Sequence, residues 1–320
     1  MLKRMATLLL AIVCMAGSAL AEKIMYVNNP NPTDRLNLRR YPDRESLSHG
    51  KYYNGAEVTV LQTEGEWSEV IIGRGAGQAR GWMMSKFLSS EKPKSVMAQH
   101  ATTAPVKAYQ QPSASAQTMT IAAGRRMSTI GVLEQTTRYW WHVKVYTDSS
   151  EGPYYAYINE QDLINKAVSL TPEHGVLVYV SNPDHTDRLH LREAPSESSK
   201  SLGKYYNGCI GEMIGFSEDG EWLNVRLYGR TGWMKSSFLC IEGQRNTAYY
   251  GIPSIRVTSE KAPAYTYPEI AKSNYAVTIK KGTVLDVLGL VGEDKLHVRT
   301  EDGSTCFVYA ADTDFTDPKK

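Results

Sequence analysis

The chain has 320 residues, a length that allows roughly two or three domains of about 100–200 residues each. Hydrophobic residues make up 42% and charged residues 22%, and the aromatic residues are mainly tyrosine, with 20 Tyr against 6 Trp and 5 Phe. Tyrosine suits half-buried strands and hydrated contact surfaces. The composition excludes a disordered chain, a coiled coil and a polytopic membrane protein.

Residues 1–21 have the layout of a secretory signal. A basic start with Lys3 and Arg4 is followed by an apolar stretch over 6–16 and by the small-x-small site Ala19-Leu20-Ala21. The apolar stretch is too short to span a bilayer, so we expect cleavage before Glu22 and an extracellular, cell-wall-associated or periplasmic protein.

The formal net charge of +2 belongs to this segment. Its removal takes away Lys3 and Arg4 and no acidic residue, so the mature chain has equal numbers of basic and acidic residues. A neutral chain without a basic stripe is not expected to bind nucleic acid. Lipid attachment at Cys14 is disfavoured, because Val13 stands where a small residue should precede a lipidated cysteine.

The rest of the chain is a compound repeat. Tyr26–Gly55 and Tyr179–Gly208 share Thr-Asp-Arg-Leu-x-Leu-Arg and Gly-Lys-Tyr-Tyr-Asn-Gly, and both are followed by Gly-Glu-Trp, Gly-Trp-Met and Phe-Leu. We name the ranges 22–90 and 175–241 the first and second A repeats. Each repeat is expected to be one structural unit.

A weaker pair of segments alternates with the A repeats. Met119–Gly131 matches Val277–Gly289, and Trp141-His-Val-Lys matches Leu296-His-Val-Arg. We name the ranges 104–168 and 254–317 the first and second B repeats. The order A-B-A-B indicates duplication of an A-B pair, with polar linkers between the repeats.

The predicted elements of each repeat are strands. In the first A repeat they cover 56–61 with period-two alternation after an Asn-Gly turn, then 67–72 and 81–84; the B repeats show similar segments at 143–145 and 285–288. Short strands with glycine-rich turns predict an all-β fold of four tandem small barrels, each near the lower size limit for a self-sufficient core.

The A repeats resemble the bacterial SH3 (SH3b) domain. The resemblance rests on Leu36-Asn-Leu-Arg39, a proline-containing loop, Tyr-Asn-Gly55, Trp67 and the closing Gly81-Trp-Met, all in order, and the second A repeat carries the same series. The B repeats lack Leu-x-Leu-Arg and resemble the family as divergent members. The resemblance implies a partly open barrel of five to seven strands and a role in binding peptidoglycan peptides or other wall components.

Catalysis is not expected. The chain has no Gly-x-Ser-x-Gly, no His-x-His and no His-Glu-x-x-His, and the three cysteines after the signal lie in or beside repeat strands. No remaining stretch is long enough for a catalytic domain, and no metal or other cofactor is predicted. A less favoured alternative is that the chain is an accessory part of a cell-wall hydrolase with an unrecognised activity. Hydrolytic activity that persists after both B repeats are removed would support this alternative.

The candidate ligand-binding residues come in matched sets from the two A repeats. They are Arg39, Tyr52, Tyr53 and Trp82 in the first, and Arg192, Tyr205, Tyr206 and Trp233 in the second. Adjacent tyrosines on a strand point to opposite faces, so one of each pair is expected in the core and the other is free to meet a ligand.

For the arginines and tryptophans two interpretations stay open. Arg39 and Arg192 are favoured as structural residues, paired with a nearby Asp or stacked on Trp, over contact with a ligand carboxylate. Trp82 and Trp233 either close the barrel or line a groove. Trp67 and Trp222, in mid-strand before apolar residues, are predicted to be core.

Cys209 and Cys240 replace Ala56 and Ser89 of the first A repeat, both within one repeat. In an exported chain this co-occurrence favours a disulfide, worth about 2–4 kcal/mol to a small barrel. Two independent small buried residues are the alternative.

Together these patterns predict an exported, non-enzymatic array that binds cell-wall peptide or a surface protein. Two equivalent A sites would raise avidity. The alternative is a structural or protein-interaction scaffold in which the barrels pack on each other.

Overall fold

The computed structural model describes residues 23–135, 138–147, 152–184, 186–241, 251–269 and 272–317. The predicted signal at 1–21, with Cys14, lies outside the described residues. The regular elements of the described chain are almost all antiparallel strands, which form two sheets, one of 14 strands and one of 13. The all-β prediction is confirmed.

The first sheet contains the first A and B repeats. The A strands are β1 (Lys23–Val27), β2 (Leu36–Arg39), β3 (Ser48–Tyr52), β4 (Glu57–Glu64), β5 (Trp67–Ile72), β6 (Ala79–Met84) and β7 (Leu88–Ser89). The B strands are β9 (Val106–Tyr109), β10 (Thr118–Ile121), β11 (Arg126–Gln135), β12 (Arg138–Val145) and β13 (Tyr154–Asn159). Strand β8 (Gln99–Thr102) lies before the range named the first B repeat and pairs with β11, and β14 (Ala167–Ser169), at the end of that range, pairs with β8.

The second sheet contains the second A and B repeats. The A strands are β15 (Val176–Val180), β16 (Leu189–Arg192), β17 (Ser201–Tyr205), β18 (Ile210–Phe216), β19 (Trp222–Leu227), β20 (Arg230–Lys235) and β21 (Leu239–Ile241). The B strands are β22 (Ser254–Arg256), β23 (Lys261–Tyr265), β24 (Tyr275–Lys280), β25 (Val284–Val291), β26 (Lys295–Arg299) and β27 (Thr305–Tyr309).

Helix in the described residues is confined to short pieces. The one α-helix of the described residues, α1 (Glu160–Lys166), begins after Asn159, whose side chain accepts a hydrogen bond from the Asp162 amide at 2.9 Å. The 3-10 turns are η1 (Gly75–Gly77), η2 (Ser85–Phe87), η3 (Ser236–Phe238), η5 (Lys272–Asn274) and η6 (Ala310–Asp312).

The two sheets repeat one strand order. The A strands follow β3-β2-β6-β5-β4-β1-β7 in the first sheet and β17-β16-β20-β19-β18-β15-β21 in the second, and the B strands follow β10-β9-β13-β12-β11 and β24-β23-β27-β26-β25. Buried apolar residues form four main clusters, each drawn mainly from one repeat. The number of separate barrels stays a prediction, because strands of neighbouring repeats join one sheet.

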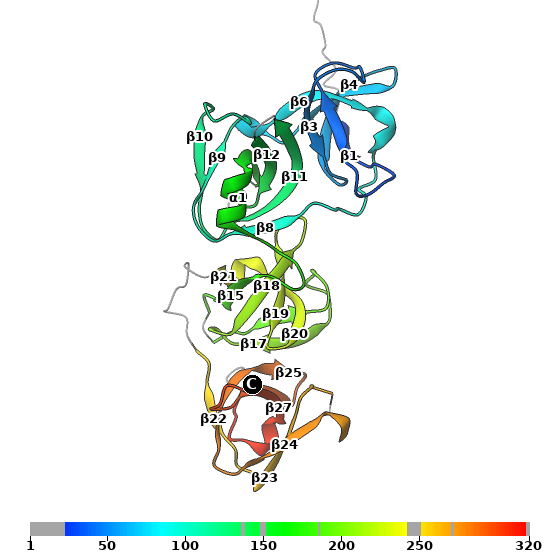
Figure 1. Cartoon of the computed structure of the whole chain (residues 1–320). Helices are drawn as coiled ribbons and strands as arrows, with labels where there is room; N and C mark the ends of the chain where they lie inside the picture. Colours follow the sequence, from blue (N-terminus) through cyan, green and yellow to red (C-terminus); the bar gives the residue numbers. More distant parts are fainter. Residues whose placement is uncertain are drawn as a thin grey trace, which may run out of the picture.

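Each A repeat joins its B repeat through a sheet edge. Strand β3 pairs with β11, with Tyr52 opposite Gly131, and β17 pairs with β25, with Tyr205 opposite Gly289. Glycine is needed because a Cβ at Gly131 would lie 2.6 Å from Cδ1 of Tyr52. We name these two contacts the A–B seams; the first runs between the blue and green parts of Figure 1.

The two sheets also contact each other, through β8, the first B repeat and the second A repeat. The Gln99 amide donates to the Phe216 carbonyl at 2.7 Å and accepts from the Phe216 amide at 3.0 Å. The Arg126 guanidinium donates to the carbonyl of Gly220, and the ring of Tyr146 packs edge-on against Phe216. Figure 1 shows the resulting stack, with the second A repeat between the first sheet's lobes and the second B repeat.

Candidate functional site

A cavity of about 360 Å³ opens on the outer face of the first A repeat. Strand β2 positions part of its wall: Leu36 and Leu38 are buried, so the alternating Asn37 and Arg39 face outward. Trp67 at the start of β5 completes the wall beside Met84 at the end of β6. We name this cavity the Trp67 depression.

The depression is basic and partly aromatic. Its lining residues include four cations and one carboxylate, which are Arg35, Arg39, Arg44, Lys86 and Asp34, together with the rings of Trp67 and Phe87. The ammonium of Lys86 lies 4.9 Å from the Phe87 ring centroid. Such a surface suits an anion attached to an apolar or planar group, because cations and aromatic faces are presented together.

Two of the arginines are held differently. The Arg39 guanidinium donates to the Ser46 carbonyl at 2.7 Å, which ties it to the loop after β2. Arg44 lies in that loop and is exposed, and its closest carboxylate contact among the described residues is Glu66 at 3.9 Å. An exposed pair at this distance contributes little, so Arg44 is available to an incoming anion.

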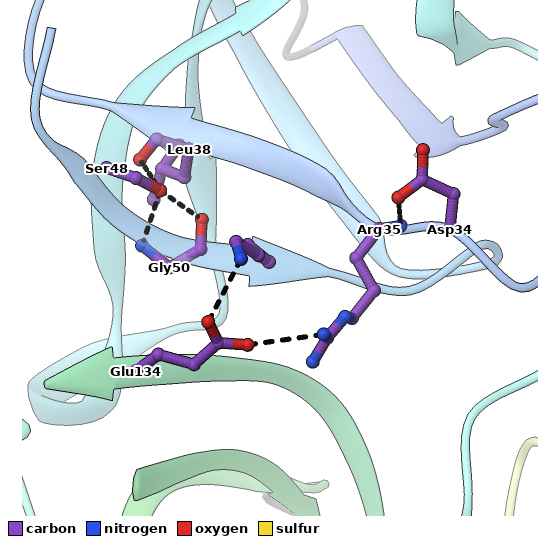
Figure 2. Close-up of polar contacts among 7 residues, drawn as sticks. Asp34, Arg35, Leu38, Ser48, Gly50 and Glu134 are labelled. Carbon is purple, nitrogen blue, oxygen red and sulfur yellow. Dashed lines mark hydrogen bonds and ion pairs between the residues drawn. The ribbon is translucent and has the colours of Figure 1, made fainter. Parts of the chain in front are cut away.

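Arg39 follows an irregularity in the strand pairing. The register of β2 against β3 shifts between Leu38 and Arg39. The Ser48 hydroxyl donates to the Gly50 carbonyl at 2.9 Å and accepts from the Gly50 amide at 3.3 Å, as Figure 2 shows. A bulge re-aims the side chain that follows it, which places Arg39 toward the loop.

Arg35 is positioned by the neighbouring B repeat. Glu134, near the end of β11, accepts from Arg35 at 3.2 Å and from Lys51 at 3.0 Å (Figure 2). The hydrogen bond from Lys51 and the charges of both cations lower the pKa of Glu134. Arg35 also lies over the ring of Tyr53, with its Cζ 5.7 Å from the centroid. The first A–B seam therefore holds one edge of the depression.

The structure brings some of the predicted site residues together. Arg39 lies directly opposite Trp82, and Arg192 directly opposite Trp233, on neighbouring strands. Both tryptophans are half-buried, and both arginines donate to a loop carbonyl, Arg192 to Ser199 at 2.7 Å. The loop carbonyl, rather than an Asp, is the arginines' partner. Trp82 is absent from the lining of the depression, where Trp67 stands instead.

Tyr52 and Tyr205 are removed from the ligand-binding set by burial. They are 1% and 0% exposed, and their hydroxyls bond Nδ1 of His142 at 3.0 Å and of His297 at 3.2 Å across the A–B seams. The sequence alone did not reveal this partner because it lies about 90 residues away in the chain.

The second tyrosine of each pair behaves differently in the two repeats. Tyr53 remains half-buried beneath Arg35, as alternation predicts. Tyr206 is 4% exposed, because it packs into the core of the second B repeat. Tyr206 is therefore also removed from the ligand-binding set.

The second A repeat closes its equivalent of the Trp67 depression. Lys235 replaces Met84, and its ammonium lies 5.7 Å from the ring centroid of Trp222 while pairing with Glu197 at 2.7 Å. Trp222 is 6% exposed, whereas Trp67 is half-buried and lines a cavity. The core prediction is confirmed for Trp222 and wrong for Trp67.

Sequence reasoning missed Arg35, Arg44, Trp67 and Lys86 as members of a site. Two of them mark differences between the copies: Arg44 corresponds to Glu197 and Lys86 to Ser237. Residues that are identical in the two A repeats are mainly those that the shared fold needs. The residues of this site differ between the two A repeats, so a comparison based on identity does not select them.

The expected disulfide is not formed. Cys209, Cys240 and Cys306 are free thiols. Strand β15 lies between the two cysteines: its Val180 amide donates to the Cys209 carbonyl, and its Tyr179 pairs with Cys240. Two strand spacings amount to roughly 9–10 Å, beyond the Cα separation of about 4.4–6.8 Å that a disulfide bridges.

Comparison with known proteins adds little to this geometry. No protein-family model and no curated protein matches the chain. One similar solved structure is described as "Structure of NlpC2 from Trichomonas vaginalis", with a TM-score of 0.23 and 9% identity over 46% of this chain and 50% of that one. The chain thus spans half the length of that protein, and a likeness this slight supports no conclusion.

The described residues hold neither a cluster of metal ligands nor a membrane-spanning helix. No group of three or more His, Cys, Asp or Glu there is arranged to hold a metal ion. None of the helices described is long and apolar enough to cross a membrane.

Proposed function

We propose that the chain is an exported, non-catalytic binding protein that recognises carboxylate-bearing cell-wall peptides through the Trp67 depression. The single observation that carries the proposal is the open, basic and aromatic surface of the first A repeat. The resemblance of the A repeats to SH3b domains supports the class of ligand, and the signal-like residues 1–21 support the location.

The proposal assigns unequal roles to the two A repeats. The first has Arg44 and Lys86 beside an open Trp67, whereas in the second Lys235 and Glu197 cover Trp222. Binding through one site replaces the avidity expected from two equal sites. The duplicated repeat then acts as a spacer with the same fold.

Retention of the mature protein on purified peptidoglycan tests the proposal. Trp67→Ala and Arg44→Glu, the latter importing the residue of the second repeat, are each expected to weaken retention about tenfold. Trp222→Ala is the matched control for fold damage and should leave retention unchanged. No retention of the unaltered protein, or equal retention of all variants, would reject the wall-binding function.

A second candidate function is a structural scaffold. The observation that favours it is the pair of A–B seams together with the Gln99 and Arg126 contacts, which join all four repeats. Small-angle scattering distinguishes the candidates when combined with the retention assay. A rigid particle without wall retention favours the scaffold, and retention that depends on Trp67 favours the binding protein.

A further inference from the structure

A second cavity, of about 370 Å³, lies where three repeats and two linkers meet. The first A repeat contributes Glu57, the following linker Lys92, the first B repeat Ser128 and Lys144, and the second A repeat Glu218. This volume is within the range of about 300–1,000 Å³ in which proteins hold small ligands. We name it the junction cavity.

The junction cavity contains two cations and two carboxylates, of which only one cation and one carboxylate form an ion pair with each other. Lys92 pairs with Glu218 at 2.7 Å. The Lys144 ammonium lies 5.1 Å from the ring centroid of Tyr146, and no carboxylate of the described residues is within ion-pair distance of it. Glu57 likewise lacks an ion pair to any described cation.

The surroundings of Lys144 disfavour its charged form. Burial lowers its pKa, the charges of Glu57 and Glu218 act in the opposite direction, and those of Lys92 and Arg74 reinforce the lowering. A partly buried ammonium with no carboxylate at ion-pair distance is costly, because the Tyr146 ring and more distant charges replace only part of the hydration that it has lost.

The second B repeat shows how the same position is satisfied. Arg299 corresponds to Lys144, and it pairs at 2.9 Å with Asp286 on the neighbouring strand. Asp286 and Arg299 lie directly opposite each other, as Ser128 and Lys144 do in the first B repeat. The first B repeat therefore has the cation without a carboxylate opposite it, and Ser128 instead bonds the Tyr146 hydroxyl at 3.3 Å.

We infer that the junction cavity binds a zwitterionic amino acid or short peptide, with its carboxylate at Lys144 and its ammonium group at Glu57. The ligand carboxylate takes the place that Asp286 occupies in the second B repeat. The site is separate from the Trp67 depression, so it goes beyond the proposed function and does not depend on it. Because three repeats line the cavity, a bound ligand also stabilises their contact.

Calorimetric titration of the mature protein with alanyl-alanine tests the inference. Two charge-assisted contacts predict saturable binding with a Kd of about 1 mM. N-acetyl-alanyl-alanine lacks the ammonium group and alanyl-alanine amide lacks the carboxylate. Each is expected to bind about tenfold more weakly. Absence of binding by alanyl-alanine, or equal binding of all three compounds, would overturn the inference.

Two variants locate the site. Lys144→Met removes the cation, and Ser128→Asp supplies the internal carboxylate that the second B repeat has, so each should weaken alanyl-alanine binding about tenfold. Lys107→Met, on the exposed face of β9, is the matched control and should bind normally. Unchanged binding by Ser128→Asp, with an unaltered circular dichroism spectrum, would refute the placement at Lys144.

Discussion

Acid should loosen the first A–B seam by protonating His142. This side chain is 1% exposed, and its Nε2–H donates to the Gly77 carbonyl at 2.8 Å. Its Nδ1 therefore accepts from the Tyr52 hydroxyl at 3.0 Å, and the ring stacks on Tyr157 with centroids 4.4 Å apart. The Tyr52 contact requires the neutral imidazole, because a protonated Nδ1 cannot accept a hydrogen bond. The Gly77 contact is kept on protonation and opposes the lowering of the pKa by burial.

The pKa shift sets the size and direction of the effect. Burial lowers the pKa of His142 to about 4 in the folded protein, against about 6.5 in the unfolded chain. The unfolded state therefore binds more protons between these values, and stability falls as the pH falls through that window. The full shift corresponds to about 3 kcal/mol, of which about 2 kcal/mol is lost between pH 7 and pH 4.5.

Urea unfolding at a series of pH values measures this loss, and His142→Gln isolates it. Glutamine keeps a donor and an acceptor and does not titrate, so the variant should start less stable at pH 7 and lose about 2 kcal/mol less than the unaltered protein by pH 4.5. His174→Gln, at an exposed position, is the control and should follow the unaltered protein. Identical pH profiles for His142→Gln and the unaltered protein would refute the reasoning.

Two further predictions concern packing and thiols. Gly131→Ala should destabilise the first sheet by about 1–3 kcal/mol in urea unfolding, because its Cβ would lie 2.6 Å from Cδ1 of Tyr52. Stability equal to that of the unaltered protein would contradict the overlap at the seam. Burial raises the pKa of the Cys209 thiol to about 12 and that of the Cys306 thiol to about 11. Iodoacetamide should therefore label half-buried Cys240 first, and it should label all three thiols after denaturation without reductant. An intact mass that shows a single labelled thiol would mean that a disulfide forms.

The sequence by itself determined the repeating plan of the chain. Period-two alternation and turn glycines identify strands locally, and the match of Tyr26–Gly55 to Tyr179–Gly208 predicts that the two A repeats share one strand order, as they do. Alternation also predicted that Tyr52 and Tyr53 face opposite ways. These features depend on neighbours in the chain, which a sequence displays directly.

Only the tertiary structure decided which side chains remain accessible. Tyr206 is buried because a B repeat packs against it, and Trp67 is open because Met84 and Arg44 stand where the second A repeat has an ion pair over Trp222. The carboxylate that Lys144 lacks is likewise visible only when Ser128 is seen opposite it across the sheet. Burial and charge pairing arise between strands far apart in the chain, so local pattern could not supply them.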